Sequence, residues 1–521
     1  MKHCRHRPIL HPILIVAAAI GIADSLTAQS QPAAGSAPDS QMNESLGELK
    51  SQVRELKQLV LQLEQQTNDS RAEIVRLRQE LQASRPASPG ARLAVGADEE
   101  SEAHAGVAGP QPDERMNRLE ENEQLLAGKI DEQYQTKLES ASKYRVRFSG
   151  IVLFNLFSNS GSVDNLDVPG WAREPGPGNS SGALGGTLRQ SILGFEVFGP
   201  MFMGARTSGN VNFDFGGGFP TVDNGVTFGL ARLRTAAFHL DWKNTSLIAG
   251  QDQLFISPDS PTSFASLIIP PLAYAGNLWT WTPQVRVEHR LPQSNNSAVT
   301  LQAALLDPLT GEPPVFQWYR VPQAGERSRA PAVAGRVAYT HPLFGHPLTI
   351  GASGYYSRQN WGFNRDVNAW AGMTDWNLPL AAKFSLSGLF YRGAAIGGLG
   401  AAVGRSVLYN GDLENPTTSV IPINTVGGWA QLKFRPGPRI EFNAAFGMDN
   451  PFAADLRAFG GNAQTYGDPN LSRNLGGFGN VIYHPRSDLL FSLEYRRLRT
   501  FNINDAGYQA GQLNLGMGVL F

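Results

Sequence analysis

Residues 438–449 read Pro-Arg-Ile-Glu-Phe-Asn-Ala-Ala-Phe-Gly-Met-Asp, and this stretch decides the fold. In it Ile440 and Phe442 alternate with Arg439 and Glu441, so apolar and polar side chains occupy every second position. A period of two is typical of a β-strand with one apolar face and one polar face. A helix would instead repeat its apolar positions every three or four residues.

The same alternation recurs from residue 144 to residue 521, separated by turn residues. It predicts about 16 antiparallel strands. We place them at 146–157, 188–199, 202–215, 227–241, 244–255, 283–291, 297–306, 331–341, 346–357, 367–377, 380–392, 425–435, 438–449, 474–484, 487–500 and 510–521.

The connections between these strands alternate in length. The short ones include Gly199-Pro200, Lys243-Asn244, 341–345, Leu378-Pro379, 436–438 and Pro485-Arg486. The long ones are 158–187, 216–226, 256–282, 307–330, 358–366, 393–424, 450–473 and 501–509. Short turns at one end and long loops at the other are typical of outer-membrane β-barrels.

The number of strands decides which way the apolar face points. A barrel of about 16 strands is too wide for side chains to fill. We therefore expect a water-filled lumen lined by the polar faces and an outer wall that contacts outer-membrane lipid. Closure of the barrel also pairs every backbone group, as the hydrocarbon layer requires.

Composition excludes several other classes of protein. The chain has 521 residues, a formal net charge of −1 and 17% charged residues, which gives no sign of nucleic-acid binding. No run of 18 apolar residues follows the first 30 residues, so a helical membrane protein is excluded. Cys4 is the only cysteine, and we find no metal-binding or cofactor-binding motif.

The first 143 residues predict a different organisation. Residues 1–28 have the basic start, apolar core and small-residue end of a signal peptide. Residues 42–83 carry heptads that predict a periplasmic α-helical coiled coil, followed by a disordered linker (84–112) and a helical stem (113–143). The heptad positions are Leu46, Val53, Val60, Thr67, Ile74 and Leu81, and Leu49, Leu56, Leu63, Ser70 and Leu77.

Two motifs carry a resemblance to a known family. The chain closes with 514–521, in which alternation leads to Phe521, similar to the signal that the barrel-assembly machinery reads. Residues 230–238 and 247–255 resemble a paired-strand motif of DcaP-like porins and their relatives, the phosphate-selective porins O and P. The resemblance implies a homotrimer with one pore per subunit, whereas the heptads alone favour two strands. The dense tyrosine–arginine clusters of phosphate porins are not found here.

A pore predicts two groups of functional residues. Loop 256–282 is expected to fold inward and form the constriction with Asp259, Ser263, Phe264, Tyr274, Trp279 and Trp281; alternatively it covers the mouth or a subunit interface. Strand parity predicts lumen-facing cations at Arg147, Arg206, Arg232, Arg234, Arg286, Arg290, Arg336, Lys383, Lys433, Arg435, Arg439 and Arg496. Fewer acids share these faces, namely Asp214, Glu288, Glu441 and Glu494, so we expect a mild preference for anions. Alternatively, the arginines pair with the acids and hold the wall together.

The sequence thus predicts a non-enzymatic outer-membrane porin for passive diffusion of small anionic or polar solutes. One alternative is a structural tether whose coiled coil binds peptidoglycan or another periplasmic partner. The other is an outer-membrane phospholipase, which needs a serine beside a histidine on the lipid-facing wall. His239 and His289 lie on predicted strands, but no partner serine is identifiable for either of them.

Overall fold

The structure is a computed structural model that describes residues 145–176, 181–219, 229–293, 296–314 and 319–521. The expected signal peptide, coiled coil, linker and helical stem all lie outside these residues. The described residues belong to one compact unit, Gly109–Phe521, and they are those in which the sequence predicts the barrel.

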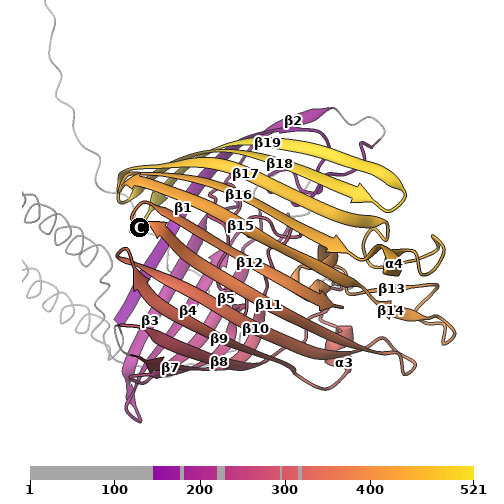
Figure 1. Ribbon diagram of the computed structural model, residues 1–521, viewed down its shortest axis with the longest axis horizontal. Helices are drawn as coiled ribbons and strands as arrows, with labels where there is room; N and C mark the ends of the chain where they lie inside the picture. Colours follow the sequence, from indigo (N-terminus) through magenta and orange to yellow (C-terminus); the bar gives the residue numbers. More distant parts are fainter. Residues whose placement is uncertain (1–144, 177–180, 220–228, 294–295, 315–318) are drawn as a thin grey trace, which may run out of the picture. The chain divides into compact units, whose positions relative to one another are not determined.

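One antiparallel sheet closes on itself where β1 (Arg145–Ser160) pairs with β19 (Asp505–Leu520), as Figure 1 shows. The sheet has 17 strands, but β2 (Gly182–Thr187) and β3 (Ile192–Phe202) share one place, because both pair with β1 at different heights. The barrel therefore has 16 strand positions, which confirms the predicted barrel architecture.

The other strands follow in chain order around the barrel. They are β4 (Ala205–Asp214), β5 (Arg232–Asp241), β6 (Thr245–Gln253), β7 (Trp281–Pro292), β8 (Ala298–Leu306), β9 (Ala332–Leu343), β10 (His346–Asn360), β11 (Asp366–Ala381), β12 (Phe384–Ala394), β15 (Asn424–Gly437), β16 (Ile440–Pro451), β17 (Leu471–Arg486) and β18 (Leu489–Asn502).

Small elements lie in the long loops. They are α3 (Ala324–Arg327), α4 (Ala453–Leu456), the 3-10 turns η1 (Gly397–Leu399) and η2 (Ala402–Gly404), and the hairpin of β13 (Val407–Tyr409) and β14 (Val420–Pro422). Among the described residues, we find no helix with the length and apolar character needed to span a bilayer.

The predicted turns Gly199-Pro200 and Leu378-Pro379 are wrong, because these residues lie within β3 and β11 and the chain turns after Phe202 and Ala381. Two further differences are larger. Strand β2 was missed, because its Gly-Ala-Leu-Gly-Gly-Thr sequence lacks a clear polar–apolar alternation. The predicted loop 501–509 is wrong: β18 and β19 continue through it and turn at Ile503 and Asn504. Gly507, at a φ of +83°, supplies a left-handed conformation close after this turn.

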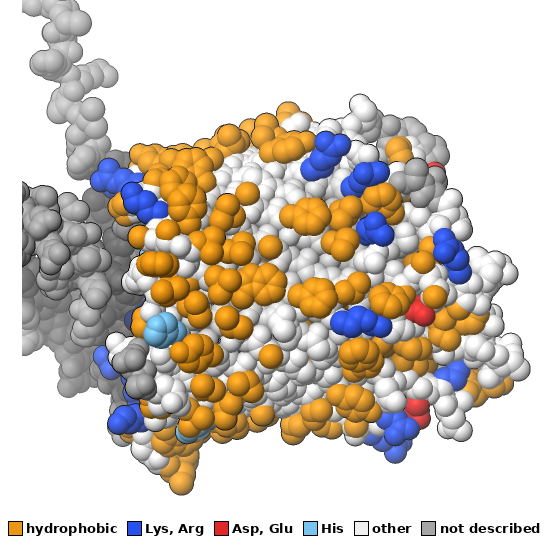
Figure 2. All heavy atoms as spheres, in the orientation of Figure 1, with side chains coloured by type: hydrophobic (Ala, Val, Ile, Leu, Met, Phe, Trp, Pro, Cys, Tyr) orange, Lys and Arg blue, Asp and Glu red, His pale blue; other side chains and the backbone are white. Residues whose placement is uncertain are grey.

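The outer wall carries the apolar faces. On β1, Val152, Phe154 and Leu156 are exposed, whereas Leu153 and Asn155 between them are buried. Figure 2 shows hydrophobic side chains spread over the outward face of the strands, with most charged side chains toward the two ends. Such a belt matches the hydrocarbon layer of a membrane.

The interior is less uniformly wet than predicted. Inward-facing Leu389, Trp429 and Phe478 are buried in one apolar cluster with residues of loops 254–280 and 395–423. The expectation of a lumen lined only by polar residues is therefore wrong for this part of the wall. A barrel of 16 strands is too wide for the strand side chains alone to fill. The long loops fold into this space, and their apolar side chains pack against Leu389, Trp429 and Phe478.

Candidate functional site

The connection between β6 and β7, residues 254–280, crosses the interior of the barrel. Its backbone is held by lumen-facing side chains far around the wall: the Asn155 amide donates to the carbonyl of Phe264, at 2.9 Å. Asn480 donates to the carbonyl of Thr262, also at 2.9 Å, and the Gln431 side chain accepts from the Thr262 N–H. Because β1, β15 and β17 supply these groups, the loop lies inside the lumen and not over the mouth.

Glycines on the inner wall make room for this loop. A Cβ atom on Gly447 would clash with the carbonyl oxygen of Ala275, and one on Gly476 would lie 2.9 Å from the Leu272 side chain. On the loop itself, Gly276 has a φ of +100°, and a Cβ there would clash with the Gly428 carbonyl. The close approach of loop and wall therefore depends on glycine at both surfaces.

Arg232 and Arg234, at the start of β5, form a cationic cluster that faces loop 254–280. A register shift between β4 and β5 lies beside Arg234. The Arg232 guanidinium contacts Asp214 at 2.7 Å, and Arg234 contacts the same carboxylate at 3.7 Å. Both guanidinium carbons lie 4.9 Å from the ring centroid of Trp281. Arg232 also donates to the carbonyl of Ile268 at 2.5 Å, so the cluster is joined to the loop.

Arg232 and Arg234 are paired with an acid, which is the alternative left open above for the lumen arginines. Their own strand carries none nearby, but Asp214 comes from the neighbouring strand β4, directly opposite Arg232. Strand parity had placed Asp214 on the lumen face without giving its register relative to β5. Two cations share one buried carboxylate, so this cluster keeps an excess of positive charge.

Most of the other predicted lumen cations are also paired. The pairs are Arg147–Glu196 (3.5 Å), Arg286–Asp252 (3.1 Å), Arg336–Asp375 (2.6 Å), Lys433–Glu441 (3.0 Å), Arg435–Glu441 and Arg496–Glu494 (2.8 Å). Of the predicted lumen acids, Glu288 accepts a hydrogen bond from the Gln302 amide at 2.7 Å. The lumen acids are therefore more numerous than predicted, because Glu196, Asp252 and Asp375 were missed although strand parity could have found them.

Four predicted cations, Arg206, Arg290, Lys383 and Arg439, are exposed near the short-turn end of the barrel. Within the described part of the chain, none of them has an ion pair. Lys383 and Arg439 lie in the turns β11–β12 and β15–β16 and not on strands, which corrects their predicted placement.

The constriction residues are distributed along the whole loop. Trp171, which the sequence analysis missed, contacts Tyr274 edge-on at 5.4 Å between ring centroids, and Tyr274 lies 6.0 Å from Trp279. Trp279 in turn lies 5.3 Å from Trp281, so four partly buried rings form a continuous series. The remaining three lie apart from it: Phe264 packs on the Ile151 and Leu153 cluster, the Ser263 hydroxyl accepts from the Ala265 N–H, and Asp259 is partly exposed.

A cavity of about 340 Å³ lies between the loop and Arg234. Three of its lining residues have a buried polar atom with no protein partner: Nη1 of Arg234, Oγ of Ser257 and Nε1 of Trp279. Serine and threonine hydroxyls make up much of the remaining polar lining. The cavity can therefore accept a small hydrophilic solute that offers hydrogen-bond acceptors.

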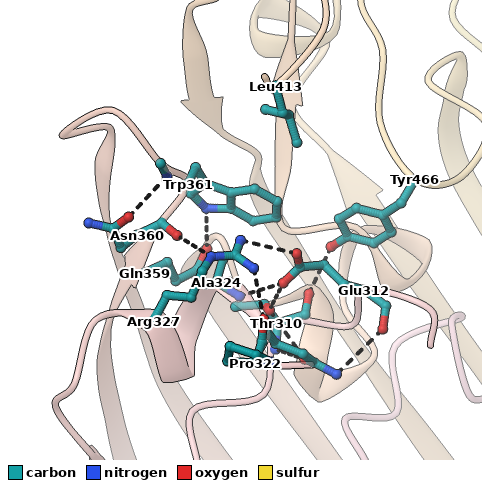
Figure 3. A network of polar contacts seen from close by, with 12 residues as sticks. Thr310, Glu312, Pro322, Ala324, Arg327, Gln359, Asn360, Trp361, Leu413 and Tyr466 are labelled. Carbon is teal, nitrogen blue, oxygen red and sulfur yellow. Dashed lines mark hydrogen bonds and ion pairs between the residues drawn. The ribbon is translucent and has the colours of Figure 1, made fainter. Parts of the chain in front are cut away.

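The long-loop end of the lumen opens on a cavity of about 590 Å³ lined by Trp171, Tyr274, Arg405 and Tyr466, among other residues. Tyr466 also belongs to a network of polar contacts between the long loops, which Figure 3 shows. Glu312 accepts from the Thr310 hydroxyl at 2.6 Å, and Tyr466 donates to the Thr310 carbonyl at 2.8 Å. The loops at this end are thus held together by their own side chains.

Two observations bear on metal binding and on the hydrolase alternative. Within the described ranges, no group of three or more His, Cys, Asp or Glu residues is placed to hold a metal ion. Among the described histidines, His341 alone has a serine hydroxyl as a hydrogen-bond partner: its Nδ1 lies 2.8 Å from Oγ of Ser297. No carboxylate of the described residues hydrogen-bonds His341, so the third group of a hydrolase triad is not in place.

A closed antiparallel barrel of 16 strand positions with an apolar outer belt and an inward-folded loop defines a porin-type β-barrel. Among solved structures, the outer membrane channel DcaP of Acinetobacter baumannii is similar, at a TM-score of 0.57 and 16% identity over 74% of this chain and 100% of that one. The chain therefore has the barrel fold of DcaP-like porins, as the sequence resemblance implied.

Two other solved structures are more distant. An anion-selective porin from Comamonas acidovorans has a TM-score of 0.43 and 13% identity over 73% of this chain and 100% of that one. OprB of Pseudomonas putida has a TM-score of 0.43 and 10% identity over 72% of this chain and 94% of that one. No known sequence family matches the chain, and no curated protein does.

Proposed function

We propose that this protein is an outer-membrane porin through which small hydrophilic solutes diffuse passively. The observation that carries the proposal is loop 254–280, which crosses the lumen of a closed, lipid-belted barrel and meets side chains of β1, β15 and β17. We expect a loop in this place to narrow the pore. The cavity beside Arg234 is the point at which a solute meets the narrowest part.

The same porin has a mild preference for anions. Arg232 and Arg234 share a single carboxylate at the constriction, and Arg206, Arg290, Lys383 and Arg439 add charge toward the short-turn end. Fixed cations raise the local concentration of anions in a channel with low-dielectric walls. Ion pairing elsewhere on the wall keeps the preference small.

The proposal extends to the orientation of the barrel in the membrane and to its oligomeric state. The long loops face the cell exterior and the short turns face the periplasm, as in other barrels of this kind. We propose that residues 42–83, which lie outside the described residues, form a periplasmic coiled coil and that the subunits form a homotrimer with one pore each. Peptidoglycan is a possible ligand of the coiled coil only in the tether alternative, in which the barrel serves as an anchor.

Planar-bilayer recording with a salt gradient tests the proposal. We expect stable single-channel conductance and a reversal potential of the sign that corresponds to anion selectivity. A protein that inserts but does not conduct would contradict the porin function. A reversal potential of the opposite sign would contradict the assigned role of Arg232 and Arg234 and leave the porin function standing.

The enzyme alternative has one observation in its favour, the contact between Ser297 and His341. A lipase assay on the protein and on its Ser297→Ala variant decides it. We expect no activity above background in either protein, because the described residues supply no group to orient the histidine.

A further inference from the structure

Arginines face outward along the long-loop end of one side of the barrel. They are Arg358 on β10, Arg392 on β12, Arg473 on β17, and Arg497 and Arg499 on β18, and we call them the arginine row. Their positions share parity with exposed aromatic residues nearer the middle of each strand, such as Tyr356, Phe390 and Tyr495. Figure 2 shows Lys and Arg side chains gathered at this end of the face, beyond the broad hydrophobic area.

Strand register makes the row continuous. Arg392 pairs with Val426 of β15, and Val426 pairs with Asn450 of β16. Arg473 then donates to the Asn450 side chain at 2.9 Å, and the Phe501 ring lies under both Arg473 (5.7 Å) and Arg499 (4.6 Å). With about 4.8 Å between neighbouring strands, the row from β12 to β18 spans roughly 20 Å.

The charge of the row is largely uncompensated. Arg358 pairs with Asp366 at 2.5 Å. The other four contact rings, amides or carbonyl groups, for example Arg392 with Phe452 (4.3 Å) and Arg497 with the Gln509 side chain (2.7 Å). No ion pair is found for these four in the described part of the chain. Their guanidinium groups are thus held in place by neutral partners, and their positive charge is not balanced by a carboxylate of the described residues.

The row is confined to one side. At the outward positions of β1 to β9 that the structure describes, neither lysine nor arginine occurs. Among outward-facing strand positions, the row is therefore restricted to the β10–β18 side of the outer wall.

We infer that the arginine row binds the phosphate groups of a phosphorylated glycolipid of the outer leaflet, of the lipid A type. The row lies at the boundary between the apolar belt and the long loops, where lipid headgroups lie in the proposed orientation. Arginine binds phosphate bidentately and keeps its charge in a poorly hydrated environment. A row of several arginines over roughly 20 Å fits a headgroup that carries more than one phosphate better than single-phosphate lipids. The inference goes beyond the porin function and rests only on its proposed orientation.

The test compares the full-length protein with a triple variant, Arg392→Gln, Arg473→Gln and Arg499→Gln, in nanodiscs. Native mass spectrometry or microscale thermophoresis measures binding of lipid A, of dephosphorylated lipid A and of phosphatidylglycerol. We expect the wild type to bind lipid A, to lose that binding when the phosphates are removed, and to bind phosphatidylglycerol more weakly. The triple variant should bind lipid A at least tenfold more weakly.

A matched control carries three changes among exposed cations at the other end, Arg145→Gln, Lys243→Gln and Arg486→Gln. It removes the same charge and should bind lipid A like the wild type. Equal weakening in the control and in the triple variant would overturn the inference, because it would mean that total charge and not the row sets the affinity. Phosphatidylglycerol binding as tightly as lipid A would overturn the assignment to a glycolipid.

Conductance of the same proteins separates this inference from the porin function. The triple variant should conduct like the wild type, because its three changes lie on the outer surface. Loss of lipid A binding with normal conductance supports the inference. A wild type that binds lipid A through the row without conducting would refute the porin function and leave the row in place.

Discussion

At the scale of the residue, the charge of the proposed constriction depends on a single carboxylate. Asp214 is fully buried and contacts both Arg232 and Arg234. Its removal leaves two guanidinium groups facing the solute without a counter-charge. We therefore expect Asp214→Asn to raise the anion-to-cation permeability ratio roughly twofold and to lower stability by about 3 kcal/mol.

Reversal potentials in a salt gradient measure this change, and Asp366→Asn is the matched control because Asp366 lies on the outer surface. The double variant Arg232→Gln and Arg234→Gln should shift the reversal potential the other way. Equal potentials for Asp214→Asn and the wild type would show that this cluster does not set selectivity.

A second residue-scale prediction concerns pH. Asp164 lies in the loop after β1, where burial raises its pKa from 3.8 to about 6, although its side chain accepts hydrogen bonds from the Gly170 and Trp171 N–H groups. A raised pKa means that folding favours the protonated form. This contribution to stability is present in full below pH 3.8 and is lost as the pH rises through about 6.

Asp164→Asn should therefore stabilise the protein at pH 8, by about 1–2 kcal/mol, and change little at pH 4. The amide oxygen still accepts both backbone hydrogen bonds and carries no charge. Thermal unfolding of the two proteins across this pH range checks it. A variant that is less stable than the wild type at pH 8 would contradict the proposed cost of the buried charge.

At the scale of the element, the constriction loop is held by the shape of the wall beneath it. Gly447 leaves no room for a Cβ atom beside the Ala275 carbonyl. Gly447→Val should displace the loop and raise single-channel conductance, by roughly twofold if the loop leaves the lumen. Gly354→Ala is the control, since a Cβ there meets nothing within 4 Å. Unchanged conductance in Gly447→Val would mean that the loop is not the narrowest element.

The strands were predictable from sequence because apolar side chains on the outer wall alternate with mostly polar side chains that face the lumen. In β16 and β19, for example, parity alone assigns Phe442 and Leu515 to the outer wall, where the structure exposes them. Lumen-facing arginines such as Arg336 were predictable for the same reason. Their partners were not, because an ion pair such as Arg336–Asp375 depends on register across β9 to β11, which parity does not give.

The path of the loops was harder to predict. Loop 254–280 has no period, so its contacts with Asn155 and Asn480 cannot be read from the sequence. The apolar cluster that it forms with Leu389 and Trp429 depends on two loops meeting inside the barrel. The abundance of glycine was visible in the sequence. The sequence does not show, however, which glycines lie on the inner wall and leave space for loop 254–280.

At the scale of the whole molecule, transport and anchoring are separable. If the barrel alone conducts, deletion of residues 42–83 should leave single-channel conductance and reversal potential unchanged. The same deletion should weaken the trimer if the coiled coil contributes to assembly, which native mass spectrometry measures. Lost envelope integrity with normal solute uptake would instead favour the tether function for this segment.

The seam between β1 and β19 has a consequence for biogenesis. It joins Asn155 to Asn514 by a hydrogen bond of 2.9 Å across 359 positions of the chain. Until the last strand is available, every partly assembled sheet keeps two unpaired edges, which would bind other chains or aggregate. Closure of the barrel therefore requires both ends of the 145–520 sheet at once, and shielding of these edges before β19 is available would limit aggregation.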